Sequence, residues 1–287
     1  MSARRLIVAA DDFGMSAGVN AGIIRAHTEG ILTEASLMVT GRAVDEAVAL
    51  ARATPTLSVG LHLVLAQGRA ASPAARVPRL VAATGEFGVN PIAAGFRYFF
   101  TPGIRAELHR EVSAQIEAFL ATGLPLSHVD GHVTVHMHPV VVEILIDVCE
   151  RYRIRTVRLP REPLAAALRF DRRHLARKLF EGTVFTILSR WAEPRLKRAR
   201  LRHPDRIYGL HQTGHVGEDY VAAVLGALPP GVSELYCHPA LIDDEARRWR
   251  PLDYASEQEL AALTSPRVRA AIEREGVELI SYRDLAA

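Results

Sequence analysis

Residues 4–20 read RRLIVAADDFGMSAGVN, a short apolar run that ends in two adjacent carboxylates and a glycine-containing turn. An apolar run followed by a turn and then a helical pattern is how a strand–helix unit of a parallel sheet begins. Neighbouring carboxylates repel each other, so Asp11 and Asp12 lower the stability of the fold unless a cation offsets their charge or their surroundings differ. A solvated turn with a helix N-cap is the plain alternative, and the rest of the chain has to decide between the two.

The composition predicts a folded protein that does not cross a membrane. The chain has 287 residues, of which 49% are hydrophobic and 23% charged, with a net charge of +3. Its two cysteines, Cys149 and Cys237, are too few for a disulfide framework, which favours a reducing compartment. No stretch reaches about 18 uninterrupted apolar residues, and the first apolar run is too short for a signal peptide. We therefore expect a cytoplasmic protein, either free or peripheral on the inner membrane.

Strand-like and helix-like patterns alternate along the chain. The predicted strands are residues 6–10, 34–40, 58–65, 126–132, 156–160, 206–211, 233–239 and 277–282. The predicted amphipathic helices between them include residues 16–30, 43–53, 105–123 and 140–152. This alternation predicts an α/β protein, and seven or eight units in this length favour a TIM-like (β/α) barrel over an open sheet. A single domain over residues 1–287 is expected.

Two stretches interrupt the rhythm and are expected to be insertions at the site face of the barrel. Residues 66–104 are rich in Gly, Pro and Ala and contain the aromatic run FRYFF. Residues 161–203 hold 12 basic and 4 acidic residues, whereas the remainder holds 23 basic and 28 acidic residues. Basic residues interleaved with Leu, Phe, Ile and Trp are typical of a helix that lies on an anionic bilayer, although a solvated cap over the barrel is equally compatible. The segment has no nucleic-acid-binding motif, so we expect no such partner.

Ionisable residues gather where the predicted strands end. In a parallel barrel these ends form the active site. The residues placed there are Asp11, Asp12, His62, Asp130, His132, Arg158, His211 and His238. Carboxylate and imidazole together suit a divalent cation with positions left for water and substrate. Taken singly, His62 could be a hydrogen-bonded core histidine and Arg158 a surface charge.

The densest patch is LSHVDGHVTVHMHP, residues 126–139. Alternate strand residues share a face, so His128, Asp130 and His132 could point the same way. Catalytic metal sites commonly use three protein ligands, so we expect one or two of these histidines to bind metal and others to orient a ring. Cys237 and His238 are neighbours that face opposite ways in a strand, so we expect Cys237 to be buried and not a nucleophile.

Five motifs carry a resemblance to a known family: VAADDFGMSAGVNAGI, GLHL, HVDGH, VRLP and YCHP. In this order and spacing, nearly the whole chain resembles the YdjC-like carbohydrate deacetylases, and within them the branch associated with hopanoid biosynthesis. The resemblance implies a metal-dependent barrel enzyme that removes the N-acetyl group of an amino sugar. Zn²⁺ and Mg²⁺ are the expected cations, without a choice between them. The implied substrate is an N-acetylglucosamine headgroup on a hopanoid lipid.

The resemblance also implies roles for single residues. Asp12, His62 and His132 correspond to the metal ligands, and Asp11 corresponds to the general base. Arg158 resembles the arginine that holds the base, and His238 resembles the general acid, which is expected to be protonated. The remaining candidates for supporting or substrate-contacting groups are Asp130, His128, His136 and His211. Which of the two adjacent aspartates is base and which is ligand stays open at the level of sequence.

The chain departs from the family pattern at one position. The family often reads D-S-H-x-H-x-H, and Thr134 stands where the middle histidine would be. No role is therefore carried to that position, and His136 is a weaker candidate than His132.

Two other functions use some of the same residues. A metal-dependent sugar isomerase or lyase would share the ligands without needing an acid at His238. A non-catalytic, lipid-handling protein on the membrane surface would have no need to keep the whole set. The expected partners are an amino-sugar or glycolipid substrate and an anionic membrane contacted through residues 161–203; a homodimer is also compatible with the sequence.

Overall fold

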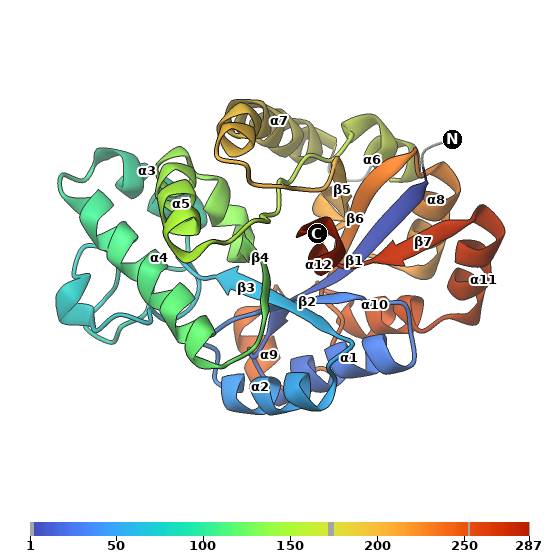
Figure 1. The fold of residues 1–287 in the computed structure, drawn as a ribbon, viewed down its shortest axis with the longest axis horizontal. Helices are drawn as coiled ribbons and strands as arrows, with labels where there is room; N and C mark the ends of the chain where they lie inside the picture. Colours follow the sequence, from blue (N-terminus) through green and yellow to red (C-terminus); the bar gives the residue numbers. More distant parts are fainter. Residues whose placement is uncertain (1–2, 172–174, 252, 287) are drawn as a thin grey trace.

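The computed structural model describes residues 3–171, 175–251 and 253–286. In this part of the chain, seven parallel strands form one curled sheet in the order β4-β3-β2-β1-β6-β5, with β7 also paired to β1 (Figure 1). The strands are β1 Arg4–Phe13, β2 Glu34–Leu37, β3 Ser58–Leu63, β4 Leu126–Gly131, β5 Arg206–Tyr208, β6 Gly231–Cys237 and β7 Val277–Ile280. The predicted α/β class is confirmed.

Helices surround the curled sheet (Figure 1). The α-helices are α1 Ala17–Thr28, α2 Val44–Ala53, α3 Pro91–Phe100, α4 Ile104–Ala121, α5 Pro139–Tyr152, α6 Leu164–Phe170, α7 Leu175–Arg198, α8 Glu218–Ala227, α9 Asp244–Trp249, α10 Ser256–Leu263, α11 Pro266–Glu275 and α12 Tyr282–Ala286. Short 3₁₀ helices are η1 Ala74–Arg76, η2 His132–Met137 and η3 Leu210–Gln212. Among the helices of the described residues, none has the length and apolar character needed to cross a bilayer.

Strand β1 is the centre of the sheet. One edge of it pairs with β6, while the other edge pairs first with β7 and then with β2. Its residues from Leu6 to Phe13 are all buried, as expected for a strand covered on both sides. The strand that carries the two adjacent carboxylates is therefore held on both edges.

The sheet is a half-barrel because its two ends do not join by a continuous ladder. The predicted strand 156–160 forms only isolated bridges, from Val157 to Val129 of β4 and from Thr156 to Arg202. Pro160 has no N–H to donate, so the segment does not continue as a ladder strand. The predicted strand 206–211 is likewise shorter: Gly209, with φ of 105°, turns the chain into η3, so His211 does not end a strand.

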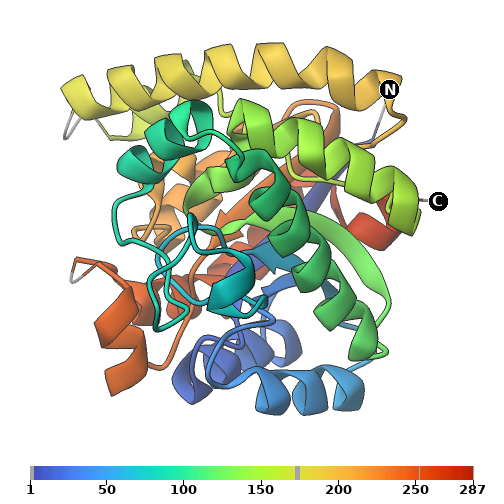
Figure 2. The same cartoon turned by 90° about the vertical axis from the view of Figure 1, so that its left-hand side faces the viewer.

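Both predicted insertions contain helices. The first includes α3, and the second includes α6 and the 24-residue helix α7. Figure 2 shows α7 lying across the top of the molecule, with α3 beneath its N-terminal half. These helices add walls beyond the carboxyl ends of the strands, where a barrel binds its ligands.

Candidate active site

A β-bulge places the two adjacent carboxylates. The prediction ended the strand at residue 10, but β1 continues to Phe13, and its register with β2 shifts between Ala10 and Phe13. Asp12 adopts a left-handed backbone, with φ of 72°. Regular strand neighbours point to opposite faces, whereas a bulge re-aims them. Asp11 and Asp12 thus both line the same cavity, and each is at least 96% buried, with exposures of 4% and 1%.

Asp12, His62 and His132 form a group that could hold a divalent cation. Oδ1 of Asp12 lies 3.5 Å from Nε2 of His62 and 3.0 Å from Nδ1 of His132. Ligand atoms of the three side chains all lie within 4.8 Å of one another, and all three residues are buried. One carboxylate and two imidazoles are a donor set that zinc and other divalent cations accept. The residues fit a metal ion.

Asp130 orients His62. The two residues are paired in register on β4 and β3, and Nδ1 of His62 donates to Oδ1 of Asp130 at 2.8 Å. This bond leaves Nε2 of His62 directed toward Asp12, the usual arrangement behind a metal-binding histidine. Burial opposes a charge on His62, but Asp130 and Asp11 raise its pKa above the ordinary value. Burial also disfavours the Asp130 carboxylate, yet Arg158 and His62 hold its pKa well below its usual range.

Arg158 is a buried cation that fixes Asp11. Its Nη1 lies 2.8 Å from Oδ2 of Asp11 and 2.6 Å from Oδ2 of Asp130. Its Nε donates to Oε1 of Glu234 at 2.8 Å, and Glu234 in turn accepts from the Tyr282 hydroxyl at 2.7 Å. The other oxygen of Asp11, Oδ1, is buried and has no hydrogen-bond partner among the described residues. One oxygen of this carboxylate is therefore held and the other is available for a proton.

Arg250 was missed by the sequence reasoning. Its Nε and Nη2 donate to Oδ2 of Asp12, and its Nη1 donates to the backbone carbonyl of His238 at 2.8 Å and to Ser256 at 2.9 Å. Burial disfavours the charged form of Asp12, but His132 and then Arg250 hold its pKa well below the usual range. In the sequence, Arg250 belongs to the run ARRWRP, which looks like an exposed basic turn. The sequence has no signal that distinguishes it.

His238 follows β6 and lines the same cavity. Its backbone N–H donates to Oε2 of Glu259 at 2.5 Å, and its ring lies against Tyr236 and Tyr254, with centroids 5.7 and 5.2 Å away. In the part of the chain that the structure describes, the buried ring atom Nδ1 has no hydrogen-bond partner. Burial lowers the pKa of His238 to about 4, although Asp12 and Asp11 oppose the shift. The imidazole is therefore neutral near pH 7, whereas a protonated ring was expected from the sequence.

The other predicted histidines lie outside this cluster. His128 is inside the barrel, stacked on Tyr282 with ring centroids 3.9 Å apart. His136 places Nε2 3.2 Å from the backbone oxygen of Arg158. His211 is on η3 and does not line the cavity. Cys237 is fully buried, as expected, and its thiol donates to the backbone oxygen of Ala9.

The cluster opens into a cavity of about 470 Å³. Asp11, Asp12, His62, His132, Arg158 and His238 all line it. Trp249, Tyr254, Phe180 and Phe185 form aromatic parts of its wall. A cavity of this size with convergent polar groups and aromatic walls suits a small polar ligand such as a sugar ring.

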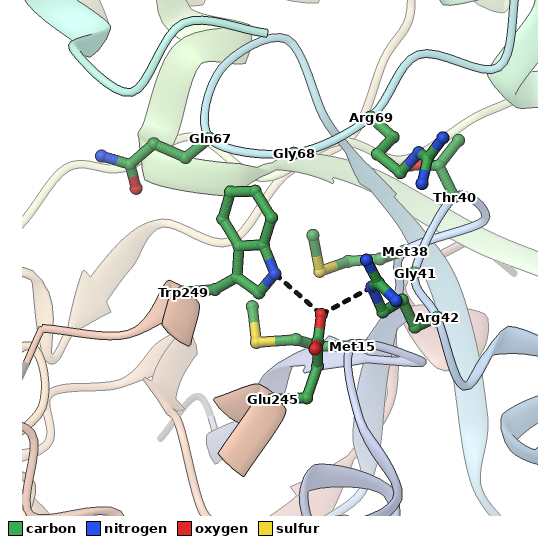
Figure 3. A pocket seen from close by; sticks show the side chains of 10 residues that line it. All are labelled: Met15, Met38, Thr40, Gly41, Arg42, Gln67, Gly68, Arg69, Glu245 and Trp249. Atoms are coloured by element: carbon green, nitrogen blue, oxygen red, sulfur yellow. Dashed lines mark hydrogen bonds and ion pairs between the residues drawn. The ribbon is translucent and has the colours of Figure 1, made fainter. Parts of the chain in front are cut away.

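A smaller neighbouring pocket supports one wall of this cavity. Figure 3 shows Glu245 between Arg42 and Trp249. Nε1 of Trp249 donates to Oε1 of Glu245 at 2.9 Å, and Nε of Arg42 lies 2.9 Å from the same oxygen. The pocket itself offers only about 30 Å³, room for about one water molecule. Its residues therefore fix Trp249, which also lines the larger cavity.

Known proteins are similar to this chain over nearly its whole length. Residues 5–274 match the family of YdjC-like proteins. The carbohydrate deacetylase of Geobacillus stearothermophilus is 36% identical over 98% of each chain, and that of Brevibacillus brevis is 32% identical over 98% of this chain and 99% of its own. The crystal structure of a putative cellobiose-phosphate cleavage protein from Enterococcus faecalis covers 100% of both chains, with 28% identity and a TM-score of 0.78. The chain belongs to the YdjC-like protein family.

Proposed function

We propose that the protein is a metal-dependent carbohydrate deacetylase that hydrolyses the N-acetyl group of an amino sugar. The observation that carries the proposal is the division between the two adjacent carboxylates. Asp12 faces His62 and His132, whereas Asp11 is held by Arg158 and keeps one oxygen free. The relatives named as carbohydrate deacetylases support the reaction class.

The cation proposed for this site is Zn²⁺ or Mg²⁺, held by Asp12, His62 and His132. When bound, such an ion would polarise the amide carbonyl and lower the pKa of a water molecule. Asp11 then acts as general base through its free Oδ1, while Arg158 keeps the carboxylate oriented through Oδ2. Asp130 keeps His62 in the tautomer whose Nε2 lone pair faces Asp12.

His238 is proposed as the acid that protonates the leaving amine. An amine is a far better leaving group than an amide anion, so this nitrogen must gain a proton before the C–N bond breaks. Because burial lowers the pKa of His238 to about 4, the imidazole starts neutral at pH 7. We therefore propose that the proton removed from water by Asp11 passes through His238 to the amine.

The proposed substrate is an amino sugar on a glycosylated hopanoid lipid. The resemblance to the hopanoid-associated branch of the family supports this, as do the basic and apolar residues of the stretch 161–203. The enzyme would then work in the cytoplasm at the inner membrane, with this stretch in contact with anionic lipid. We retain a homodimer as a proposal, which light scattering of the purified protein would check.

Acetate release tests the proposed reaction. The metal-loaded protein is incubated with an N-acetylglucosaminyl glycolipid and with a soluble N-acetylglucosamine glycoside, before and after chelation. We expect acetate with the loaded protein, loss of release on chelation, and strongly reduced release by His238→Ala. A sugar isomerase or lyase would release no acetate and would not depend on His238. Folded, metal-loaded protein that releases no acetate from either substrate would contradict the proposal.

A further inference from the structure

Large apolar side chains are exposed on three stretches of the chain. In the described residues, all such exposed side chains except Leu120 and Leu241 belong to these stretches. They are Val89, Ile92, Phe96, Phe99 and Phe100 at α3, Val133 on η2, and Phe170, Leu175, Leu179, Phe180 and Ile187 at α6 and α7. We call this set the apolar rim. Scattered exposed apolar residues are normal, but such a concentration marks an interaction surface.

The apolar rim borders one part of the active-site cavity. One rim residue of each stretch lines the cavity itself, namely Ile92, Val133 and Phe180. Helices α3 and α7 both pack against η2, which joins the three stretches into one region. Figure 2 shows the same relationship, with α3 beneath the N-terminal half of α7. The exposed residues therefore form a border to the site.

Helix α3 has a buried side and an apolar side that faces water. Tyr98 is 1% exposed, and its hydroxyl donates to the backbone oxygen of Leu65. Phe96 and Phe100 are 63% and 76% exposed and stack on each other with centroids 6.4 Å apart. A helix anchored in this way holds its aromatic residues outward at a cost in hydration, which is recovered when they meet an apolar phase.

Helix α7 is apolar near the entrance and basic farther along. Phe180 and Ile187 are exposed on one side of it, and Arg190 and Arg198 continue along that side toward its C-terminal end. Ala192 and Leu196, on its other side, are buried. The helix sequence contains six basic and two acidic residues. Exposed aromatic and aliphatic residues next to basic ones are typical of helices at the surface of anionic bilayers.

We propose that the apolar rim is a membrane-docking surface and that the cavity opens directly onto an anionic lipid bilayer. A second copy of the chain or another protein seated on the rim would cover the entrance, whereas a bilayer presents a sugar headgroup there. The basic half of α7 complements the negative charge of the lipid. This inference rests on the proposed function, because it names the source of that site's substrate. It adds α3 and η2 to the contact expected from residues 161–203.

Vesicle binding tests the docking surface without turnover. The full chain is sedimented with phosphatidylcholine vesicles and with vesicles that also contain phosphatidylglycerol. Two rim variants, the double substitution Phe96→Ser and Phe100→Ser and the single substitution Ile187→Ser, lie outside the cavity lining. Leu120→Ser is the matched control, since Leu120 is 43% exposed on α4 and is not part of the rim.

We expect each rim variant to lower the partition coefficient on anionic vesicles, by about tenfold for the double substitution, with no change for Leu120→Ser. Arg190→Gln should lower binding about fivefold on anionic vesicles and leave binding to neutral vesicles unchanged. Acetate release from the soluble glycoside should stay at the parent level in all these variants.

Three outcomes would overturn the docking surface. They are a parent chain that does not bind anionic vesicles at low salt, rim variants that bind as the parent does, and rim variants that dissociate a dimer without changing vesicle binding. A different result would contradict the proposed function and leave the docking surface intact. In that case vesicle binding would depend on the rim as described, but no acetate would be released from either substrate.

Discussion

Arg250 donates to Oδ2 of Asp12 from both Nε and Nη2, at 3.2 and 3.1 Å. The same carboxylate turns Oδ1 toward His62 and His132. One oxygen of the proposed metal ligand is thus committed to an arginine and the other is left for the cation. Asp12 is therefore expected to bind a metal ion through a single oxygen.

Removing Arg250 should destabilise the protein before any metal is added. Arg250→Met leaves the buried Asp12 carboxylate without its cation, and breaking a buried ion pair from one side costs about 3–5 kcal/mol. The control is Arg247→Met, since the Arg247 side chain is 60% exposed and pairs with Asp244 at the surface. Denaturant unfolding of the chelated proteins measures both free energies of unfolding. Equal losses for the two variants would contradict the role assigned to Arg250.

Asp11 and Asp12 should respond differently to the same substitution. Asp11→Asn should keep the metal and lower kcat by about 10²–10⁴-fold, because the base is lost. Asp12→Asn should lose the metal, while asparagine tolerates the left-handed backbone at this position. Metal content by elemental analysis and turnover are measured separately on each variant. Metal loss in Asp11→Asn with retention in Asp12→Asn would reverse the two roles.

Glu234 should act on catalysis through Arg158. Its Oε1 accepts a hydrogen bond from Nε of Arg158, and its Oε2 accepts one from the Tyr282 hydroxyl. Glu234→Gln should free Arg158 to turn, so we expect kcat to fall by about tenfold or more with a smaller change in KM. Tyr282→Phe removes only a neighbouring hydrogen bond, so it should cost about 1 kcal/mol of stability with little change in kcat. Steady-state kinetics on both variants separates these effects, and equal kcat losses would argue against a positioning role for Glu234.

The stability of the protein should depend on the protonation of His128. Burial disfavours its charged form, but hydrogen bonds with Asp130 and Glu34 raise its pKa from 6.5 to about 9. The folded chain binds this proton more tightly than the unfolded chain does. The resulting stabilisation of the folded state is therefore complete below pH 6.5 and is lost as pH rises through about 9. Its size is up to about 3 kcal/mol. Unfolding free energies at pH 6, 7.5 and 9.5 should show this fall in the parent and a flatter profile in His128→Gln.

Sequence patterns predicted most of the sheet because they report burial. The apolar run of β1 and the apolar strand around His62 are buried on both sides, and such runs are visible without any knowledge of their partners. The segment around Arg158 has the same composition but forms only isolated bridges, because ladder formation depends on a neighbour that the pattern does not describe. For the same reason, the bulge at Asp12 could not be predicted: it exists only in the register between β1 and β2.

The residues of the candidate site were likewise predictable from the sequence only in part. Asp12, His62 and His132 follow or lie within predicted strands, and the structure brings them together. Arg250 and Glu234 could not be found in the sequence, since a buried arginine in a basic run and a glutamate inside a strand look like ordinary surface charges. Both act through charges on other strands or loops, which only the folded chain brings near.

The central position of β1 has a consequence for folding. Leu6 is paired with Ser233 of β6 on one edge and with Leu279 of β7 on the other, so the strand that carries both carboxylates finds these neighbours only after most of the chain has been brought together. Such long-range pairing is slow, and until it is complete the backbone N–H and C=O groups along both edges of β1 are open to pairing with other chains. Refolding at high protein concentration should therefore lose material to aggregation at the very strand on which the chemistry depends.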